Sequence, residues 1–179
     1  MNTILINHFE ALETTTKKFL AIIKEHSPEQ QQFRPSDQAW NMLDVAEHLL
    51  NSETGINSFF KKYPPAESTR SIQFSNRIKA WLIQLFLVLP TKVRAVARVH
   101  PSKEKKVLTE LENKWQKQRQ ILKPILISFP KEKRNISVFK HPLSGPMNME
   151  NVVKFMDNHI KHHIFQLNRI RKHSNFPKI

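Results

Sequence analysis

The chain has 179 residues, a formal net charge of +14 and no cysteine. A chain of this length fits one domain, so we expect a single domain over residues 1–179. The absence of cysteine excludes disulfides, thiolate metal ligands and cysteine nucleophiles. Only 2 glycines are present, and segments rich in Lys, Glu, Gln and Asn favour helices over strands, which predicts an all-α fold.

The apolar segments are too short to cross a membrane. The most apolar stretch, residues 80–89, ends at Pro90, whereas a spanning helix needs about 20 apolar residues. The N-terminal residues lack the basic region and apolar run of a secretory signal. We therefore expect a cytoplasmic protein that makes no use of a membrane.

Four long helices are predicted from the spacing of apolar residues. Apolar side chains recur every three or four positions, the period of one buried helix face, in segments 3–25, 42–62, 104–127 and 149–172. Asn41 and Asn148 are suited to cap the second and fourth of these. A shorter helix is expected within 72–89, and 139–147 cannot be helical because it contains Pro142, Gly145 and Pro146. This pattern predicts an antiparallel four-helix bundle with one additional shorter helix.

Two of the predicted helices have a regular set of core positions. In the third helix the alternation of three and four residues runs through Leu108, Leu111, Trp115, Gln118, Leu122 and Ile125. In the last helix it runs through Val152, Met156, His159, His163, Gln166 and Ile170. Three successive polar side chains on a buried face would each cost roughly 1–3 kcal/mol without partners. A bound metal ion would satisfy the two histidines.

His159 and His163 are four residues apart, so they project two imidazoles from one helical face. A metal needs a third ligand from another element, and His48, at the edge of the apolar stripe of the second helix, is the best candidate. The alternative is a polar core patch held by hydrogen bonds alone. His162 leaves the buried face, and we expect it at the surface or beside a ligand.

The remaining histidines lack a partner at helical spacing. None of them is predicted to touch the metal centre, although the first flanks a core face and could be buried and hydrogen-bonded. They are His8, His26, His100, His141 and His173.

Several segments resemble the DinB/YfiT-like superfamily, and together they span nearly the whole chain in order. They are Trp40 with 45–49 (VAEHL), then 141–146 (HPLSGP), then 155–166 (FMDNHIKHHIFQ). The resemblance implies a four-helix bundle in which His48, His159 and His163 bind one divalent metal. Gln166 matches a glutamine that commonly follows the last ligand by three. We interpret Trp40 and the 141–146 loop as packing and turn residues.

Three neutral imidazoles leave an open position on the metal, which is typical of catalytic sites. The metal is expected to be zinc or nickel, with iron also compatible. The resemblance implies a metal-dependent hydrolase or a thiol-dependent S-transferase, acting on a small molecule and using a low-molecular-weight thiol in the second case. Asp44, Glu47 and Asp157 are candidate general bases, but each also fits an exposed or capping role.

Two other functions remain open. The charge and the basic run Lys92, Arg94, Arg98, Lys103, Lys105 and Lys106 would attract phosphates, as in a nucleic-acid-binding protein. No helix-turn-helix or zinc-finger pattern accompanies this charge, so nucleic-acid binding is not favoured. The third alternative is a non-catalytic metal-containing binding module, with the segment 74–89 covering a homodimer interface.

Overall fold

The computed structural model describes residues 2–72, 78, 82, 87 and 99–178. They form mostly helix with one two-stranded sheet, so the predicted helical character is confirmed. The long helices are α1 (Thr3–Lys24), α3 (Met42–Lys62), α5 (Leu108–Ser128) and α6 (Met149–Arg171). The short elements are α2 (Pro28–Gln32), η1 (Pro65–Glu67), η3 (Lys131–Lys133), β1 (Phe139–His141) and β2 (Gly145–Met147).

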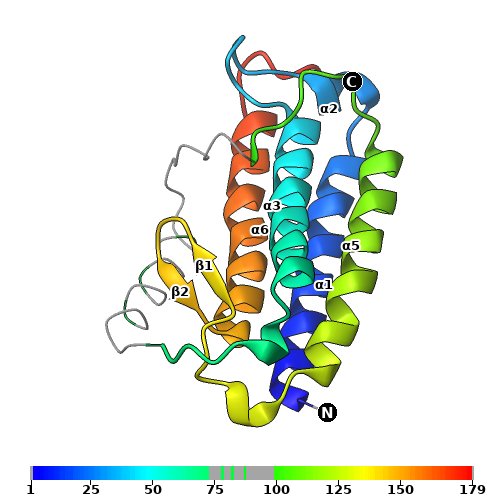
Figure 1. Cartoon of the computed structure of the whole chain (residues 1–179). Coiled ribbons are helices and arrows are strands. Elements are labelled where there is room, and N and C mark those ends of the chain that lie inside the picture. Colours follow the sequence, from blue (N-terminus) through cyan, green and yellow to red (C-terminus); the bar gives the residue numbers. More distant parts are fainter. Residues whose placement is uncertain (1, 73–77, 79–81, 83–86, 88–98, 179) are drawn as a thin grey trace.

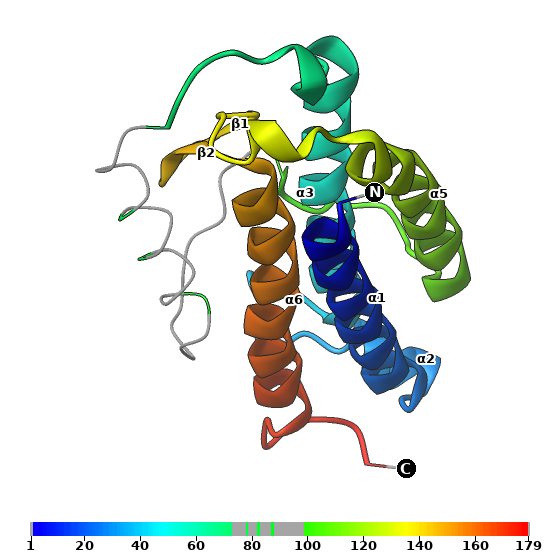
Figure 2. The ribbon, with the colours of Figure 1, turned by 90° about the horizontal axis from the view of Figure 1, so that it is seen from below.

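The four long helices lie side by side (Figure 1). α1 packs against α5 and α6, and α3 packs against the same two helices, so each long helix has two long neighbours. The view from below shows α6 and α5 on either side of α1, with α3 behind it (Figure 2). No helix among the described residues is long and apolar enough to cross a membrane.

Most predicted helix ends agree with the structure, and the start of α5 is the main exception. This helix begins at Leu108 and not at the predicted position 104. The preceding turn is held in another conformation, because the Lys106 ammonium donates to the carbonyl groups of Ser102 and Glu104 and to the Asp44 carboxylate. The predicted shorter helix within 72–89 lies almost entirely outside the described residues and stays a prediction.

Side-chain caps fix the starts of α3 and α6, as predicted. The Asn41 side chain accepts from the Asp44 N–H at 2.8 Å, and the Asp44 carboxylate accepts from the Asn41 N–H at 3.1 Å. The Asn148 side chain accepts from the Asn151 N–H at 2.8 Å. Because each cap satisfies backbone donors that the helix cannot, it sets the residue at which the helix begins and hence which side chains face inward.

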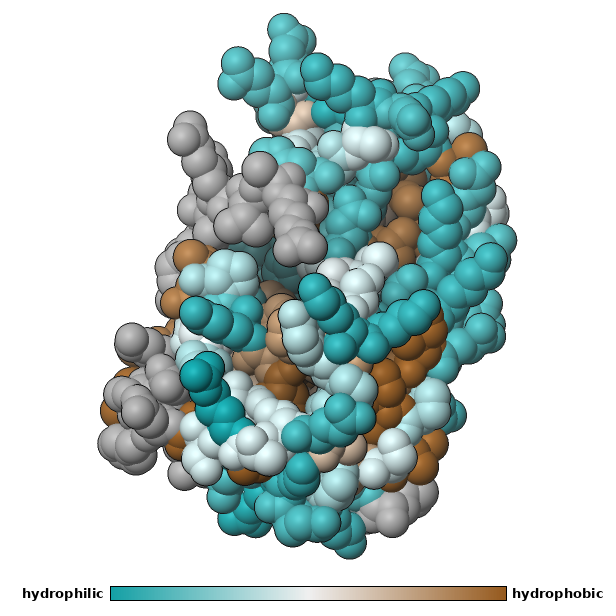
Figure 3. All heavy atoms as spheres, viewed as in Figure 1, coloured by the Kyte–Doolittle hydropathy of each residue, from teal (hydrophilic) through white to brown (hydrophobic). Residues whose placement is uncertain are grey.

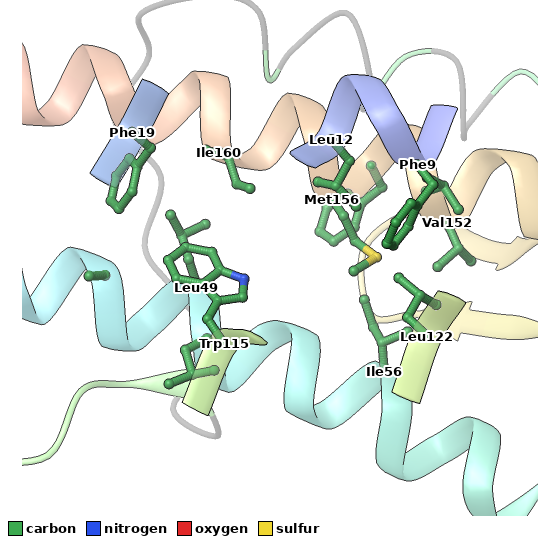
Figure 4. Close-up of a cluster of buried hydrophobic side chains, with 14 of the residues drawn as sticks. Phe9, Leu12, Phe19, Leu49, Ile56, Trp115, Leu122, Val152, Met156 and Ile160 are labelled. Carbon is green, nitrogen blue, oxygen red and sulfur yellow. The ribbon is translucent and has the colours of Figure 1, made fainter. Parts of the chain in front are cut away.

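The interior is filled by large apolar side chains from all four long helices (Figure 4). Trp115 of α5 meets Phe19 of α1 edge-to-face, with ring centroids 5.9 Å apart. The predicted core positions Gln118 and Ile125 are only partly buried, so that part of the prediction was wrong. The buried residues of α5 are Leu108, Leu111, Trp115, Arg119, Leu122 and Leu126.

The unexpected core residue, Arg119, is held by a buried ion-pair network. Its guanidinium donates to both carboxylate oxygens of Glu53 in α3, at 2.9 and 2.6 Å. It also donates to the Thr16 hydroxyl at 2.9 Å and to Glu13 at 2.7 Å in α1. One cation thereby joins three helices, and its bidentate contact with Glu53 fixes their relative positions.

Loss of this cation should be costly, because Arg119→Met leaves the Glu53 carboxylate buried without its partner. We expect the free energy of unfolding to fall by about 3–5 kcal/mol, measured by urea denaturation. The double variant Glu53→Gln with Arg119→Met should lose less. The pair of the exposed Lys24 with the partly exposed Glu112, at 2.6 Å, is the matched control, since Lys24→Met should cost under about 1 kcal/mol. Equal losses in the two single variants would contradict this account.

Candidate metal centre

The three predicted ligands converge on one point at the side of the helix assembly. His48 comes from α3, and His159 and His163 come from α6. The Nε2 atom of His159 lies 3.2 Å from Nε2 of His48 and 3.1 Å from Nε2 of His163. One nitrogen from each of the three rings lies within 4.8 Å of the others, a cluster that could hold a metal ion.

Two of the rings are oriented by a hydrogen bond on their far nitrogen. Nδ1 of His48 lies 2.9 Å from the Val99 carbonyl oxygen, and Nδ1 of His163 lies 2.8 Å from Oε1 of Gln166. Both oxygens are acceptors, so both Nδ1 atoms carry the proton and both Nε2 atoms present a lone pair to the centre. Such outer hydrogen bonds fix the tautomer and the ring direction of metal-binding histidines.

Two of the three nitrogen–nitrogen separations fit a tetrahedral ion. Metal–nitrogen bonds of about 2.0–2.1 Å at tetrahedral angles place ligand nitrogens roughly 3.3 Å apart, close to the two Nε2 separations of 3.1 and 3.2 Å. A single proton on His159 can bridge only one of its neighbours at a time. The Nε2 lone pair of the remaining neighbour would then have no donor, whereas a divalent cation satisfies all three nitrogens.

The imidazoles are neutral at physiological pH, as metal ligation requires. Burial lowers the pKa of His48 to about 4. Burial also lowers the pKa of His159 and His163 well below the ordinary value, and the neighbouring imidazoles of the cluster lower both further. Ligand nitrogens are therefore available without removing a proton from the ring.

The buried face of α6 includes the predicted positions Val152, Met156, His163 and Ile170, and it is wider than predicted. Ile160 and Leu167, outside the predicted core positions, are fully buried, whereas His159 and Gln166 are partly exposed. The polar residues of α6 thus face an open cavity and not a closed core. Of the three polar residues predicted on the buried face, His163 is buried, and the prediction is wrong for His159 and Gln166, which are partly exposed.

The cavity beside the cluster has a volume of about 1120 Å³. Aromatic rings form part of its wall, with Trp40 packed on the His48 ring at 4.9 Å and Phe155 stacked on His159 at 5.2 Å. A space-filling view shows a hollow on this face, with apolar side chains inside it and hydrophilic ones around it (Figure 3). The three Nε2 atoms therefore have an approach for a small molecule.

Sequence reasoning missed several histidines of this cavity. His100, His141 and His173 line it, and His162 is buried beside His163 with ring centroids 5.4 Å apart. The alternative of a surface position for His162 is therefore wrong. His173 follows α6 and His100 lies before α5, so helical spacing carries no information on either residue. Of these histidines, only His141 lies in a motif that the sequence analysis singles out, and that motif, 141–146, is interpreted there as a turn.

Two histidines lie away from the centre, as predicted. His8 is partly exposed, with its Nε2 atom 3.4 Å from the Glu150 carboxylate. Nδ1 of His26 lies 2.7 Å from the Ile22 carbonyl oxygen. Neither residue lines the cavity.

The candidate general bases have structural partners instead. Asp44 caps α3 and pairs with Arg34 and Lys106 at 2.7 and 2.8 Å. Glu47 accepts from the N–H and hydroxyl of Ser102, and Asp157 pairs with Lys161 at 2.7 Å. No Asp or Glu among the described residues lines the cavity.

The basic run is only partly visible, because Lys92, Arg94 and Arg98 lie outside the described residues. Of the others, Lys106 has a nearly buried ammonium that pairs with Asp44 and Glu47 at 2.8 and 3.3 Å. Lys103 and Lys105 are exposed. A cation already neutralised in this way is a poor phosphate contact, which weakens the nucleic-acid alternative.

Comparison with known proteins gives no further guide to this centre. No protein-family model matches the chain, and neither a curated protein nor a solved structure matches it. The three-histidine geometry and the cavity therefore carry the functional argument.

The depressed histidine pKa values predict a pH-dependent stability of the metal-free protein. The pKa of an unfolded histidine is about 6.5, whereas burial lowers the pKa of His48 and of His141 to about 4. Between these values the unfolded chain binds more protons, so stability is full above about pH 6.5 and falls as the pH drops towards 4. Urea midpoints of protein treated with EDTA should fall from about pH 7 to about pH 5. The variant with His159→Gln and His163→Gln should show a shallower slope; an unchanged slope would argue against buried neutral rings.

The Gln166 hydrogen bond predicts a graded effect on metal affinity. Gln166→Leu removes the acceptor that orients His163, and zinc affinity should fall about 10–100-fold in competition with a chromogenic chelator. Gln166→Glu keeps an acceptor at this place and should retain most of the affinity. If the leucine variant binds zinc like the wild type, the orienting role is wrong.

Proposed function

We propose that the protein is a metal-dependent enzyme of the DinB/YfiT type, which acts on a small molecule at a divalent ion held by His48, His159 and His163. The convergence of the three Nε2 atoms is the observation that carries the proposal. The DinB/YfiT assignment, and with it an antiparallel arrangement of the four long helices, rests on the motif residues. The packing of each long helix against two others is consistent with it.

The open side of the cluster supports catalysis over a purely structural metal. Structural zinc sites are closed by four protein ligands, whereas catalytic sites use three and leave a position for water or substrate. The described residues supply three nitrogens, and the cavity of about 1120 Å³ adjoins them. A bound zinc or nickel ion, or iron, would supply Lewis acidity that favours the thiolate form of a thiol or polarises an electrophile.

The cavity wall favours thiol transfer over hydrolysis. Hydrolytic metal sites commonly pair the ion with a carboxylate base, and no carboxylate of the described residues lines this cavity. A thiol is acidic enough to need no such base once its anion is stabilised. The chain has no cysteine, so the thiol must be a separate small molecule. In the transfer a carbon–sulfur bond forms, the bond from that carbon to the leaving group breaks, and the thiol proton passes to solvent.

The residues around the ligands have separate tasks in this proposal. Val99 and Gln166 hold the rings of His48 and His163 through their Nδ1 protons. Trp40 and Phe155 pack on His48 and His159, which keeps water from one face of each ring and offers apolar surface to a substrate. The caps of α3 and α6 set the helix positions from which all three ligands project.

The first experiment measures metal content by elemental analysis of protein purified without a histidine tag. We expect about one metal per chain in the wild type, and its loss in His48→Ala, His159→Ala and His163→Ala, because two imidazoles hold an ion far less tightly than three. His8→Ala, which changes a histidine outside the cavity, is the matched control and should keep the metal. Metal that stays in all three ligand variants would contradict the site.

The same variants separate an enzyme from a non-catalytic metal module. Glutathione with a chromogenic alkylating agent tests thiol transfer, and p-nitrophenyl acetate tests hydrolysis. The metal-loaded wild type should accelerate the first reaction, and the ligand variants should not. Acceleration of the ester alone would favour the hydrolase, and a tightly held metal with neither activity would favour the binding module.

A further inference from the structure

Strand β1 ends in a histidine whose tautomer is set by the backbone of the turn that follows. His141 is the last residue of β1 and lines the cavity. Its Nδ1 atom accepts hydrogen bonds from the N–H groups of Leu143 and Ser144, both at 3.2 Å. A nitrogen that accepts two N–H groups has no proton of its own, so the neutral ring carries its proton on Nε2.

The hairpin holds this turn in place. His141 is paired with Gly145 across the two strands, and Gly145 has a positive φ of 77°, a conformation that glycine adopts without steric cost. The strands pack against α3 and α6, the two helices that carry the metal ligands. The direction of the His141 ring is therefore tied to the same helices as the metal centre.

The ring of His141 lies one aromatic side chain away from the cluster. It packs on Phe155 with centroids 4.6 Å apart, and Phe155 stacks on His159 at 5.2 Å. In the described part of the chain, Nε2 of His141 has no hydrogen-bond partner. The Nε2–H group, on the side of the ring away from the turn, is thus an uncharged donor available to a molecule in the cavity.

The rest of the described wall offers many donors and few charged acceptors. Lys62, Lys140 and Arg169 line the cavity, and no carboxylate of the described residues does so. None of these three cations forms an ion pair with another described residue. A ligand that completes such a surface must bring acceptor oxygens.

We propose that His141 is a neutral hydrogen-bond donor that binds an acceptor oxygen, a carbonyl or carboxylate, of the molecule that occupies this cavity. The identification of that molecule as substrate rests on the function proposed above. An uncharged donor stabilises an oxygen that gains negative charge and gives up no proton to it. The substrates are therefore small molecules that carry such an oxygen, and not simple alkyl compounds.

The test uses metal-free protein at pH 7, so that its outcome does not depend on metal binding. Long-range ¹H–¹⁵N NMR of the histidine rings should show His141 as the Nε2–H tautomer, assigned by its absence in His141→Phe. Benzoate should shift this signal on titration, whereas benzylamine, which has no acceptor oxygen, should not. A Nδ1–H tautomer, or no response to benzoate, would overturn the proposal even if the protein binds metal.

Three variants separate the donor from the packing of the ring. His141→Phe keeps a ring against Phe155 and loses the donor, so benzoate should bind about tenfold more weakly by calorimetry. His141→Gln keeps an N–H donor and should restore part of this loss. His26→Phe makes the same change outside the cavity and should bind benzoate like the wild type. Equal affinity of the two phenylalanine variants would refute the role of His141. The metal content of His48→Ala, His159→Ala and His163→Ala tests the function proposed above and leaves the role of His141 unaffected.

Discussion

Three imidazole Nε2 atoms directed at one point are the constraint on which the rest of the site depends. Without a cation one proton on His159 can serve only one of its two neighbours, and with a cation all three nitrogens are satisfied, so the surrounding contacts must hold the rings in place. The chain meets this constraint with ordinary means: two helices whose starts are fixed by asparagine caps, and acceptors on the far nitrogens of His48 and His163. Rigid helices suit this task, because a metal tolerates only small errors in ligand position.

A cavity adjoins α3 and α6, so contacts elsewhere must fix the relative positions of the long helices. The buried contact of Arg119 with Glu53 lies in α5 and α3 and reaches α1 through Thr16, so it joins three helices by directional bonds. Apolar packing alone lets helices slide, since it has little directional preference. The ion pair therefore restricts the position of α3, the helix that carries His48.

Local sequence signals predicted the helices and the ligands, and long-range contacts decided what they missed. Helical spacing located α1, α3 and α6 nearly to the residue, and the four-residue spacing of His159 and His163 identified them as a pair. Spacing alone could not distinguish Gln118 from Arg119 as the core residue, because Arg119 is buried only through its partner Glu53 in another helix. His100 lies outside the helices and strands, and His141 ends a three-residue strand, so no periodic pattern could place them at the cavity.

The two oriented ligands differ in the kind of atom that holds them. His163 relies on a side chain, the Gln166 amide, whereas His48 relies on a main-chain carbonyl, that of Val99. Every residue type has that carbonyl, so the side chain at position 99 is free to change without altering the orientation of His48. At position 166 only a side chain with an acceptor atom can orient His163. Variation among natural versions of this chain should therefore be tolerated at one support of the centre and restricted at the other, although both supports serve the same purpose.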